Sequence, residues 1–169
     1  HQAAGTTDVI DLHGRLSRVV CMSCGDLSAR TDLDARMRAL NPGYEVDSDE
    51  IRPDGDFRLA QVDVESFRAP RCLACGADTL KPDVVFFGGA VPKPLVQECF
   101  ALTDAAPALL VLGSSLQVMS GLRFVRRAAA RGIPVVILTR GPTRGDELAT
   151  LRIDTELAPA LAGLVERLG

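Results

Sequence analysis

The chain of 169 residues contains no tryptophan and a single tyrosine, and aromatic side chains make up 4% of it. It also lacks a basic excess, since its formal net charge is −3 and its pI is near 5.4. Proteins that bind single-stranded nucleic acid favour basic grooves lined with aromatic side chains, and general nucleic-acid binders show a basic balance or patch. We therefore expect no nucleic-acid partner, and a zinc-ribbon domain for nucleic acid is the weakest interpretation.

Long hydrophobic runs are absent as well. The longest apolar stretches, around Leu109–Leu112 and Ile133–Leu138, have the length of a strand, whereas a membrane span needs roughly 18 apolar residues. We expect no membrane partner. Apolar residues still make up 47% of the chain, which allows a sizeable core in one domain, with or without a small insert. The chain begins with His1 instead of Met, and from this we expect that its natural N-terminus lies further upstream.

Two cysteine pairs are the most informative motif. Cys21 and Cys24 form one Cys-x-x-Cys pair, Cys72 and Cys75 form the other, and glycine follows each pair directly. This spacing turns both sulfurs of a pair toward one metal at about 2.3 Å, and glycine suits the tight turn behind them. Four thiolates leave no open position for water, so we predict one structural zinc ion. Disulfides are the alternative, and Cys99 is interpreted as a buried structural thiol.

The chain changes character near residue 81. Residues 15–80 are polar and rich in turn signals, so this segment would need its metal to fold. From residue 81 onward, apolar strand patterns alternate with helical patterns, which predicts an α/β fold with a parallel sheet and helices on both faces. The predicted strands are Asp8–Leu12, Arg18–Cys21, Asp83–Phe87, Ala108–Leu112 and Pro134–Leu138. The predicted helices are Asp32–Leu40, Pro94–Thr103, Gly121–Arg131, Thr143–Thr150 and Pro159–Leu168.

These residues, in this order, resemble the sirtuin (Sir2) family of NAD-dependent protein deacylases. The matching segments are His1–Gly5, Leu12–Gly14, the four paired cysteines, Lys81–Gly88 and Gly113–Val118. Within the family, the chain is most similar to the class II branch, which includes a mitochondrial member in animals and many bacterial proteins. The segments that carry this likeness are Leu40–Pro42, Pro53–Asp56, Ser120–Gly121 and Gly141–Arg144.

The resemblance implies an enzyme that removes an acyl group from lysine in a protein or peptide, with NAD as co-substrate. Nicotinamide, 2′-O-acyl-ADP-ribose and free lysine would be the products. His13 would be the catalytic base that deprotonates a ribose hydroxyl of NAD, a role suited to imidazole near neutral pH. The implied zinc ligands are Cys21, Cys24, Cys72 and Cys75.

Two further sets of residues follow from the same resemblance. The implied NAD-binding residues are Gly113, Ser114, Ser115, Thr139, Arg140, Gly141 and Leu157. The implied acyl-lysine-binding residues are Val85, Phe86, Phe87, Gly88 and Gly121. From the residues alone, the first set also fits a strand-to-helix turn with a core leucine, and Val85–Gly88 also fits a buried strand and turn. The strand ends that carry Gly113 and Thr139 are nevertheless where parallel sheets bind ligands.

The family's Gly-Ala-Gly-Ile-Ser phosphate loop has no counterpart in this sequence. The chain thus resembles the C-terminal two-thirds of a sirtuin catalytic domain. We expect residues 1–14 and 81–169 to form the later part of a Rossmann-type NAD-binding domain, and residues 15–80 to form a small zinc-ribbon module with four cysteine ligands. The alternatives are a truncated, non-catalytic, zinc-bearing peptide-binding module, and protein ADP-ribosyl transfer. The expected location is the cytoplasm for a bacterial protein or the mitochondrial matrix for a eukaryotic one.

Overall fold

The computed structural model describes residues 1–44 and 66–168, so the Pro53–Asp56 motif lies outside the described residues. The chain forms two compact units. We call His1–Leu12 with Gly89–Gly169 the parallel-sheet unit, and His13–Gly88 the cysteine unit. Within the described ranges, no helix is both long enough and apolar enough to cross a membrane.

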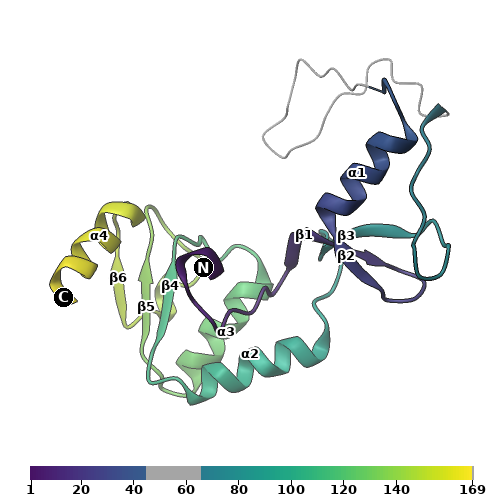
Figure 1. The fold of residues 1–169 in the computed structure, drawn as a ribbon. Coiled ribbons are helices and arrows are strands. Elements are labelled where there is room, and N and C mark those ends of the chain that lie inside the picture. Colours follow the sequence, from purple (N-terminus) through teal and green to yellow (C-terminus); the bar gives the residue numbers. More distant parts are fainter. Residues whose placement is uncertain (45–65, 169) are drawn as a thin grey trace. The chain divides into compact units, whose positions relative to one another are not determined.

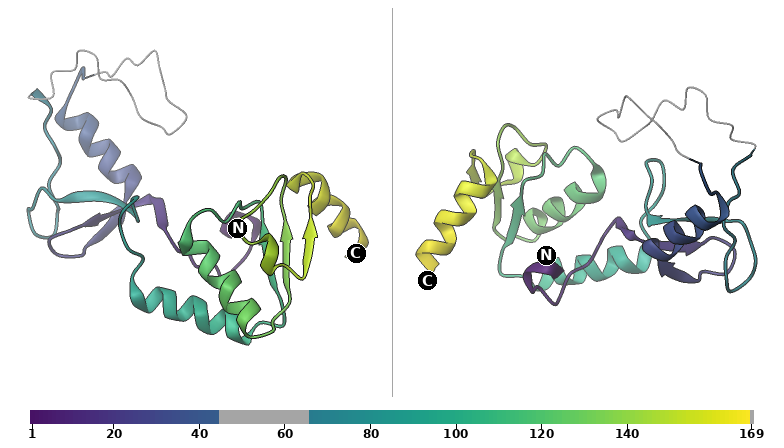
Figure 2. Two further views of the ribbon diagram at one scale, coloured as in Figure 1. Left: turned by 180° about the vertical axis from the view of Figure 1, so that it is seen from behind. Right: turned by 45° about the horizontal axis from the view of Figure 1, so that its top comes forward.

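The parallel-sheet unit contains three parallel strands in the order β4-β5-β6. Helix α3 covers one face of this sheet and helix α4 lies over the other (Figures 1 and 2). The fold class predicted from the sequence is therefore confirmed for this unit. Its elements are η1 (Gln2–Ala4), α2 (Lys93–Ala105), β4 (Leu109–Leu112), α3 (Met119–Ala130), β5 (Val135–Leu138), η3 (Asp146–Leu148), β6 (Leu151–Ile153) and α4 (Leu157–Leu168).

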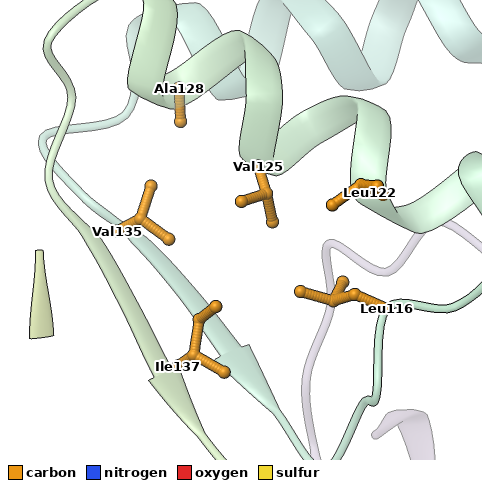
Figure 3. Close-up of a cluster of buried hydrophobic side chains, with 6 residues drawn as sticks. All are labelled: Leu116, Leu122, Val125, Ala128, Val135 and Ile137. Carbon is orange, nitrogen blue, oxygen red and sulfur yellow. The ribbon is translucent and has the colours of Figure 1, made fainter. Parts of the chain in front are cut away.

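The core of this unit lies between α3 and β5 (Figure 3). Apolar side chains three residues apart on α3 share one face of the helix, and they meet alternate side chains of β5, which share one face of the sheet. A leucine from the loop after β4 completes the cluster. Its buried members are Leu116, Leu122, Val125, Ala128, Val135 and Ile137. This cluster fixes the strand ends on which the predicted NAD-binding residues lie.

The cysteine unit contains an antiparallel sheet in the order β2-β1-β3, and α1 packs against β1 and β2. Few of its side chains are buried. Among its described residues, those are Val19, Cys21, Pro70 and Cys72. Its elements are β1 (Gly14–Cys21), β2 (Leu27–Ala29), α1 (Arg30–Leu40) and β3 (Leu80–Val84).

Two strand predictions were wrong. The apolar run Asp83–Phe87 was assigned to the parallel sheet, but β3 ends at Val84 and pairs antiparallel with β1 in the other unit. Asp8–Leu12 is not a strand, and β1 begins already at Gly14. For Asp83–Phe87 the pairing partner decides the structure, and that partner, β1, lies too far along the chain for a local pattern to reveal it.

The predicted helix Thr143–Thr150 was also wrong. Only the short 3-10 helix η3 forms there, followed by strand β6, which the sequence pattern did not reveal. The Asp146 carboxylate accepts a hydrogen bond from the backbone N–H of Thr143 at 3.0 Å. Such a contact is typical of a helix start, so it does not oppose a helix. The helix is short because the chain enters strand β6 at Leu151 and pairs there with β5.

Candidate zinc centre and active-site residues

The four paired cysteines meet in space as predicted. Their sulfurs all lie within 4.8 Å of one another, with Cys21 and Cys75 at 3.7 Å and Cys24 and Cys72 at 3.8 Å. These distances are far longer than a disulfide bond of about 2.05 Å. They match the separation of about 3.8 Å between two sulfurs that each lie about 2.3 Å from one tetrahedral zinc ion. The four cysteines are thus positioned to bind one zinc ion, and all five cysteines of the chain are free thiols.

The two pairs have the same backbone geometry. The Cys21 carbonyl accepts a hydrogen bond from the Gly25 N–H at 2.8 Å, and the Cys72 carbonyl accepts one from the Gly76 N–H at 2.9 Å. Both glycines have left-handed backbone angles, with φ of 79° and 74°. The prediction that glycine suits the tight turn behind each cysteine pair is confirmed. Residues with a side chain rarely adopt this left-handed conformation.

The sulfurs influence one another's ionisation. The backbone N–H of Cys24 is the largest of the effects that lower the pKa of Cys21 to about 6. The backbone N–H of Asp26 lowers the pKa of Cys24, but the Cys75 thiol, burial and the other two thiols outweigh it and raise that pKa to about 12. Four crowded thiols resist losing their protons together. A divalent cation among them removes this resistance, because a coordinating thiol is deprotonated outright.

His13 lies in a turn directly before β1, with its side chain exposed. Its carbonyl accepts a hydrogen bond from the Val85 N–H at 2.9 Å. The next residue, Gly14, is paired with Val84 across the sheet. The structure therefore places the predicted base beside the start of the predicted acyl-lysine loop.

Gly14 allows this close approach of β1 to β3. Its φ is 77°, and an added Cβ would lie 2.0 Å from the carbonyl oxygen of Asp83. That separation is a direct overlap with backbone, which no side-chain movement can relieve. Only glycine fits at this position.

We expect Gly14→Ala to lower the free energy of unfolding by more than about 2 kcal/mol, because it adds an overlap to the cost of a left-handed residue. Gly43→Ala is the matched control, since Gly43 has a φ of 76° and nothing within 4 Å of an added Cβ. Urea titrations of both variants measure the difference. Equal destabilisation by the two substitutions would show that the contact with Asp83 carries no cost.

The predicted acyl-lysine loop continues from β3 into solvent. Phe86 is 58% exposed and lies under the Lys81 ammonium, which is 5.2 Å from the ring centroid. Phe87 is fully exposed, and Gly88 is left-handed. The alternative interpretation of these residues as a buried strand is wrong. Gly121, the remaining predicted member of this set, belongs to the parallel-sheet unit, near the start of α3.

The predicted NAD-binding residues follow the carboxyl ends of two neighbouring parallel strands. Gly113 comes directly after β4 and donates its N–H to Leu138 at 2.9 Å, and Thr139 comes directly after β5. An added Cβ on Gly113 would lie 2.9 Å from a methyl group of Leu157, so these two residues are neighbours. The structure thus brings together residues from three separate segments at one edge of the sheet.

Sequence reasoning missed the residues that hold this edge. Asp154 accepts a hydrogen bond from the Gly141 N–H at 2.9 Å. Arg152 pairs with Asp146 at 3.0 Å, and hydrogen bonds from Thr143, together with Arg152, hold the pKa of Asp146 below its ordinary value. The only available signal was the Gly141–Arg144 motif, which indicated a family branch but no contacts.

Known proteins resemble this chain over its whole length. The Sir2 family model matches residues 1–120. The chain is 53% identical, over all of its 169 residues, to NAD-dependent protein deacetylase 1 of Streptomyces coelicolor, and it covers 56% of that protein. Over 95% of its length it is 43% identical to the mitochondrial NAD-dependent protein lipoamidase sirtuin-4 of Bos taurus, and it covers 52% of that protein.

A solved structure of Sir2 with a p53 peptide and NAD+ has the same fold. Its TM-score is 0.75 at 26% identity, and the match covers 100% of this chain and 59% of that one. The chain therefore spans between half and three-fifths of the length of the proteins that it matches.

Proposed function

This chain belongs to the Sir2 family, and on that premise we propose that it takes part in the NAD-dependent removal of acyl groups from lysine side chains. The observation that carries the proposal is the hydrogen bond between the His13 carbonyl and the Val85 N–H, with Gly14 packed against Asp83. It fixes the proposed base immediately beside a loop whose aromatic side chains are open to solvent.

In this proposal NAD supplies the ribose carbon that accepts the acyl oxygen and the nicotinamide that leaves. His13 accepts the proton of a ribose hydroxyl, because imidazole can take up and release a proton near neutral pH. Val85, Phe86, Phe87 and Gly88 are the proposed binding residues for the acyl-lysine segment, and Gly121 is a further proposed member of this set. The extended backbone of the substrate would pair with the loop as an added strand.

The parallel-sheet unit holds the adenosine half of NAD in this proposal. Its polar groups at the strand ends are the donors and acceptors that a nucleotide requires, and ligands of parallel sheets bind at these ends. The residues assigned to this role are Gly113, Ser114, Ser115, Thr139, Arg140, Gly141 and Leu157. Thr139 replaces the asparagine usual in the family and keeps a hydroxyl for the ribose.

The zinc centre of the cysteine unit takes a structural role in this proposal, with the ion coordinated by Cys21, Cys24, Cys72 and Cys75. Four cysteine ligands leave no open coordination position, so the metal holds the strands that carry His13 and Val85 and performs no chemistry. The named relatives are bacterial and mitochondrial. The matching locations for this chain are the bacterial cytoplasm or the mitochondrial matrix.

The proposal is tested by nicotinamide release. The chain and the full product of its gene would be incubated with NAD and peptides that carry acetyl, lipoyl or dicarboxyl-derived acyl groups on lysine, and products would be identified by mass spectrometry. We expect peptide-dependent release of nicotinamide together with an acylated ADP-ribose. ADP-ribosylated peptide as the product would instead indicate a transferase. A folded, zinc-loaded protein that releases no nicotinamide across the panel would support the peptide-binding module.

A further inference from the structure

Leu116 has an unusual backbone conformation. Its φ is 55°, and within residues 1–44 and 66–168 it is the one non-glycine residue with a positive φ. Its side chain is buried and points into the cluster between α3 and β5, toward Val125 and Ile137 (Figure 3). Leucine is disfavoured in this conformation, so neighbouring groups must hold it there. Leu116 lies in the middle of the Ser114–Gln117 turn, which follows β4.

One residue hydrogen-bonds to both sides of Leu116. The backbone N–H of Arg144 donates to the Ser115 carbonyl at 3.0 Å, and its guanidinium donates to the Gln117 carbonyl at 3.0 Å. The Leu116 N–H itself donates to the Ser114 hydroxyl at 3.2 Å. The turn is thus fixed at both carbonyls that flank the strained residue.

Gly145 provides the space that the Leu116 side chain occupies. An added Cβ would lie 2.7 Å from a methyl group of Leu116 and 3.2 Å from one of Ile137. The backbone of Gly145 has φ of −100° and ψ of 0°, which other residues also adopt. Glycine is therefore required here for its missing side chain and not for its conformation.

The segment that carries these two residues is itself anchored to β6. Asp146 accepts hydrogen bonds from the Thr143 N–H and from the Arg152 guanidinium, each at 3.0 Å. The same guanidinium donates to the Gly141 carbonyl. Residues 141–146 consequently form a fixed support, against which the neighbouring turn is held.

We propose that Arg144 and Gly145 are positioning residues that hold the Ser114–Gln117 turn in the shape that receives the adenosine half of NAD. Arg144 acts through hydrogen bonds to the turn, and Gly145 acts by leaving room for Leu116. The inference rests on the proposed NAD-binding function. It couples the loop after β4 to the loop after β5, which sequence reasoning treated as two separate contacts.

The test compares variants of the full gene product by calorimetric binding of ADP-ribose and by steady-state kinetics. We expect Arg144→Ala to weaken ADP-ribose binding and to raise the KM for NAD about tenfold, the size typical of one charge-assisted hydrogen bond, while the KM for the acyl peptide stays the same. Arg144→Lys should recover part of this loss, because an ammonium can still donate to the Gln117 carbonyl. Gly145→Ala should weaken binding at least as much.

Arg126→Ala and Gly163→Ala are the controls. Arg126 is exposed on α3, and an added Cβ on Gly163 meets nothing within 4 Å. Hydrogen exchange at Ser114–Gln117 provides a readout that is independent of NAD, and we expect faster exchange there in Arg144→Ala than in Arg126→Ala.

Unchanged exchange and unchanged ADP-ribose affinity in Arg144→Ala would overturn the inference. An equal rise in the KM values for NAD and peptide would also overturn it, because a general loss of structure has that effect. The parent protein answers the separate question of the proposed function. If it binds no ADP-ribose while its turn is protected as expected, the proposed function and the NAD role of the turn both fail, although the contacts themselves are real.

Discussion

Replacing His13 with alanine is expected to lower the rate of deacylation by about 10²–10⁴-fold, the usual contribution of a general base. The side chain is exposed, and the hydrogen bond to the Val85 N–H comes from the backbone carbonyl, which alanine retains. The loop and the sheet should therefore keep their structure, with a change in the free energy of unfolding within about 0.5 kcal/mol. The measurement is the rate of acyl-peptide consumption at saturating NAD.

His1→Ala is the matched control, since His1 is the other of the two histidines in the sequence and is also exposed. It should leave the rate unchanged. A His13→Ala variant that keeps more than a tenth of the parent rate would assign the base to another group. A variant that loses both activity and zinc would show that His13 supports the metal centre instead.

Features set by short spacing could be predicted from the sequence. The four zinc ligands follow from two Cys-x-x-Cys pairs. The geometry within each pair is local, and the two pairs need only to meet each other to complete the site. The strand ends after Leu112 and Leu138 follow from apolar runs that stop at Gly113 and Thr139. These predictions depend only on neighbours in the sequence. The structure confirms that the four sulfurs cluster and that the two strands pair in parallel.

Features set by distant partners could not be predicted. The β1–β3 pairing joins residues such as Gly14 and Val84, and a single chain gives no signal of that contact. Strand β6 has three residues, including the charged Arg152, so its apolar pattern is too short to identify. The hydrogen bond from Arg144 to the turn after β4 also joins segments that are distant in the sequence, so the sequence gives no signal of it.

Some apolar residues of the parallel sheet are more exposed than the sequence pattern predicts. The predicted strand Ala108–Leu112 is continuously apolar, a pattern typical of a buried strand, but Leu110 is 51% exposed and Leu112 is 37% exposed. Both residues line a cavity of about 460 Å³ beneath α4, on the face of β4 opposite to the core cluster. A continuous apolar run predicts burial on both faces of a strand, and here α4 covers its face incompletely.

Loss of the zinc ligands is expected to unfold the cysteine unit. Two of its four buried described residues, Cys21 and Cys72, are themselves ligands, which leaves Val19 and Pro70 as the other buried residues in the described part of the unit. So small a core cannot balance the conformational entropy of the unit. The binding free energy of structural zinc is about 10–16 kcal/mol in zinc-finger peptides, which is as large as the free energy of unfolding of a typical domain. Chelation or Cys72→Ser should therefore remove hydrogen-exchange protection from His13–Gly88, while strands β4 and β5 keep theirs.

Cys99→Ser is the control that separates ligand loss from thiol loss. Cys99 lies on α2 in the parallel-sheet unit, so this variant should retain one zinc ion per chain, by native mass spectrometry, and full protection in both units. Unfolding of the cysteine unit would also release the strand end that holds His13 beside Val85, so deacylation should be lost together with exchange protection at the same chelator concentration. If protection of His13–Gly88 survived complete removal of zinc, the antiparallel sheet would be stable without its metal, and the structural role of the four cysteines would be wrong.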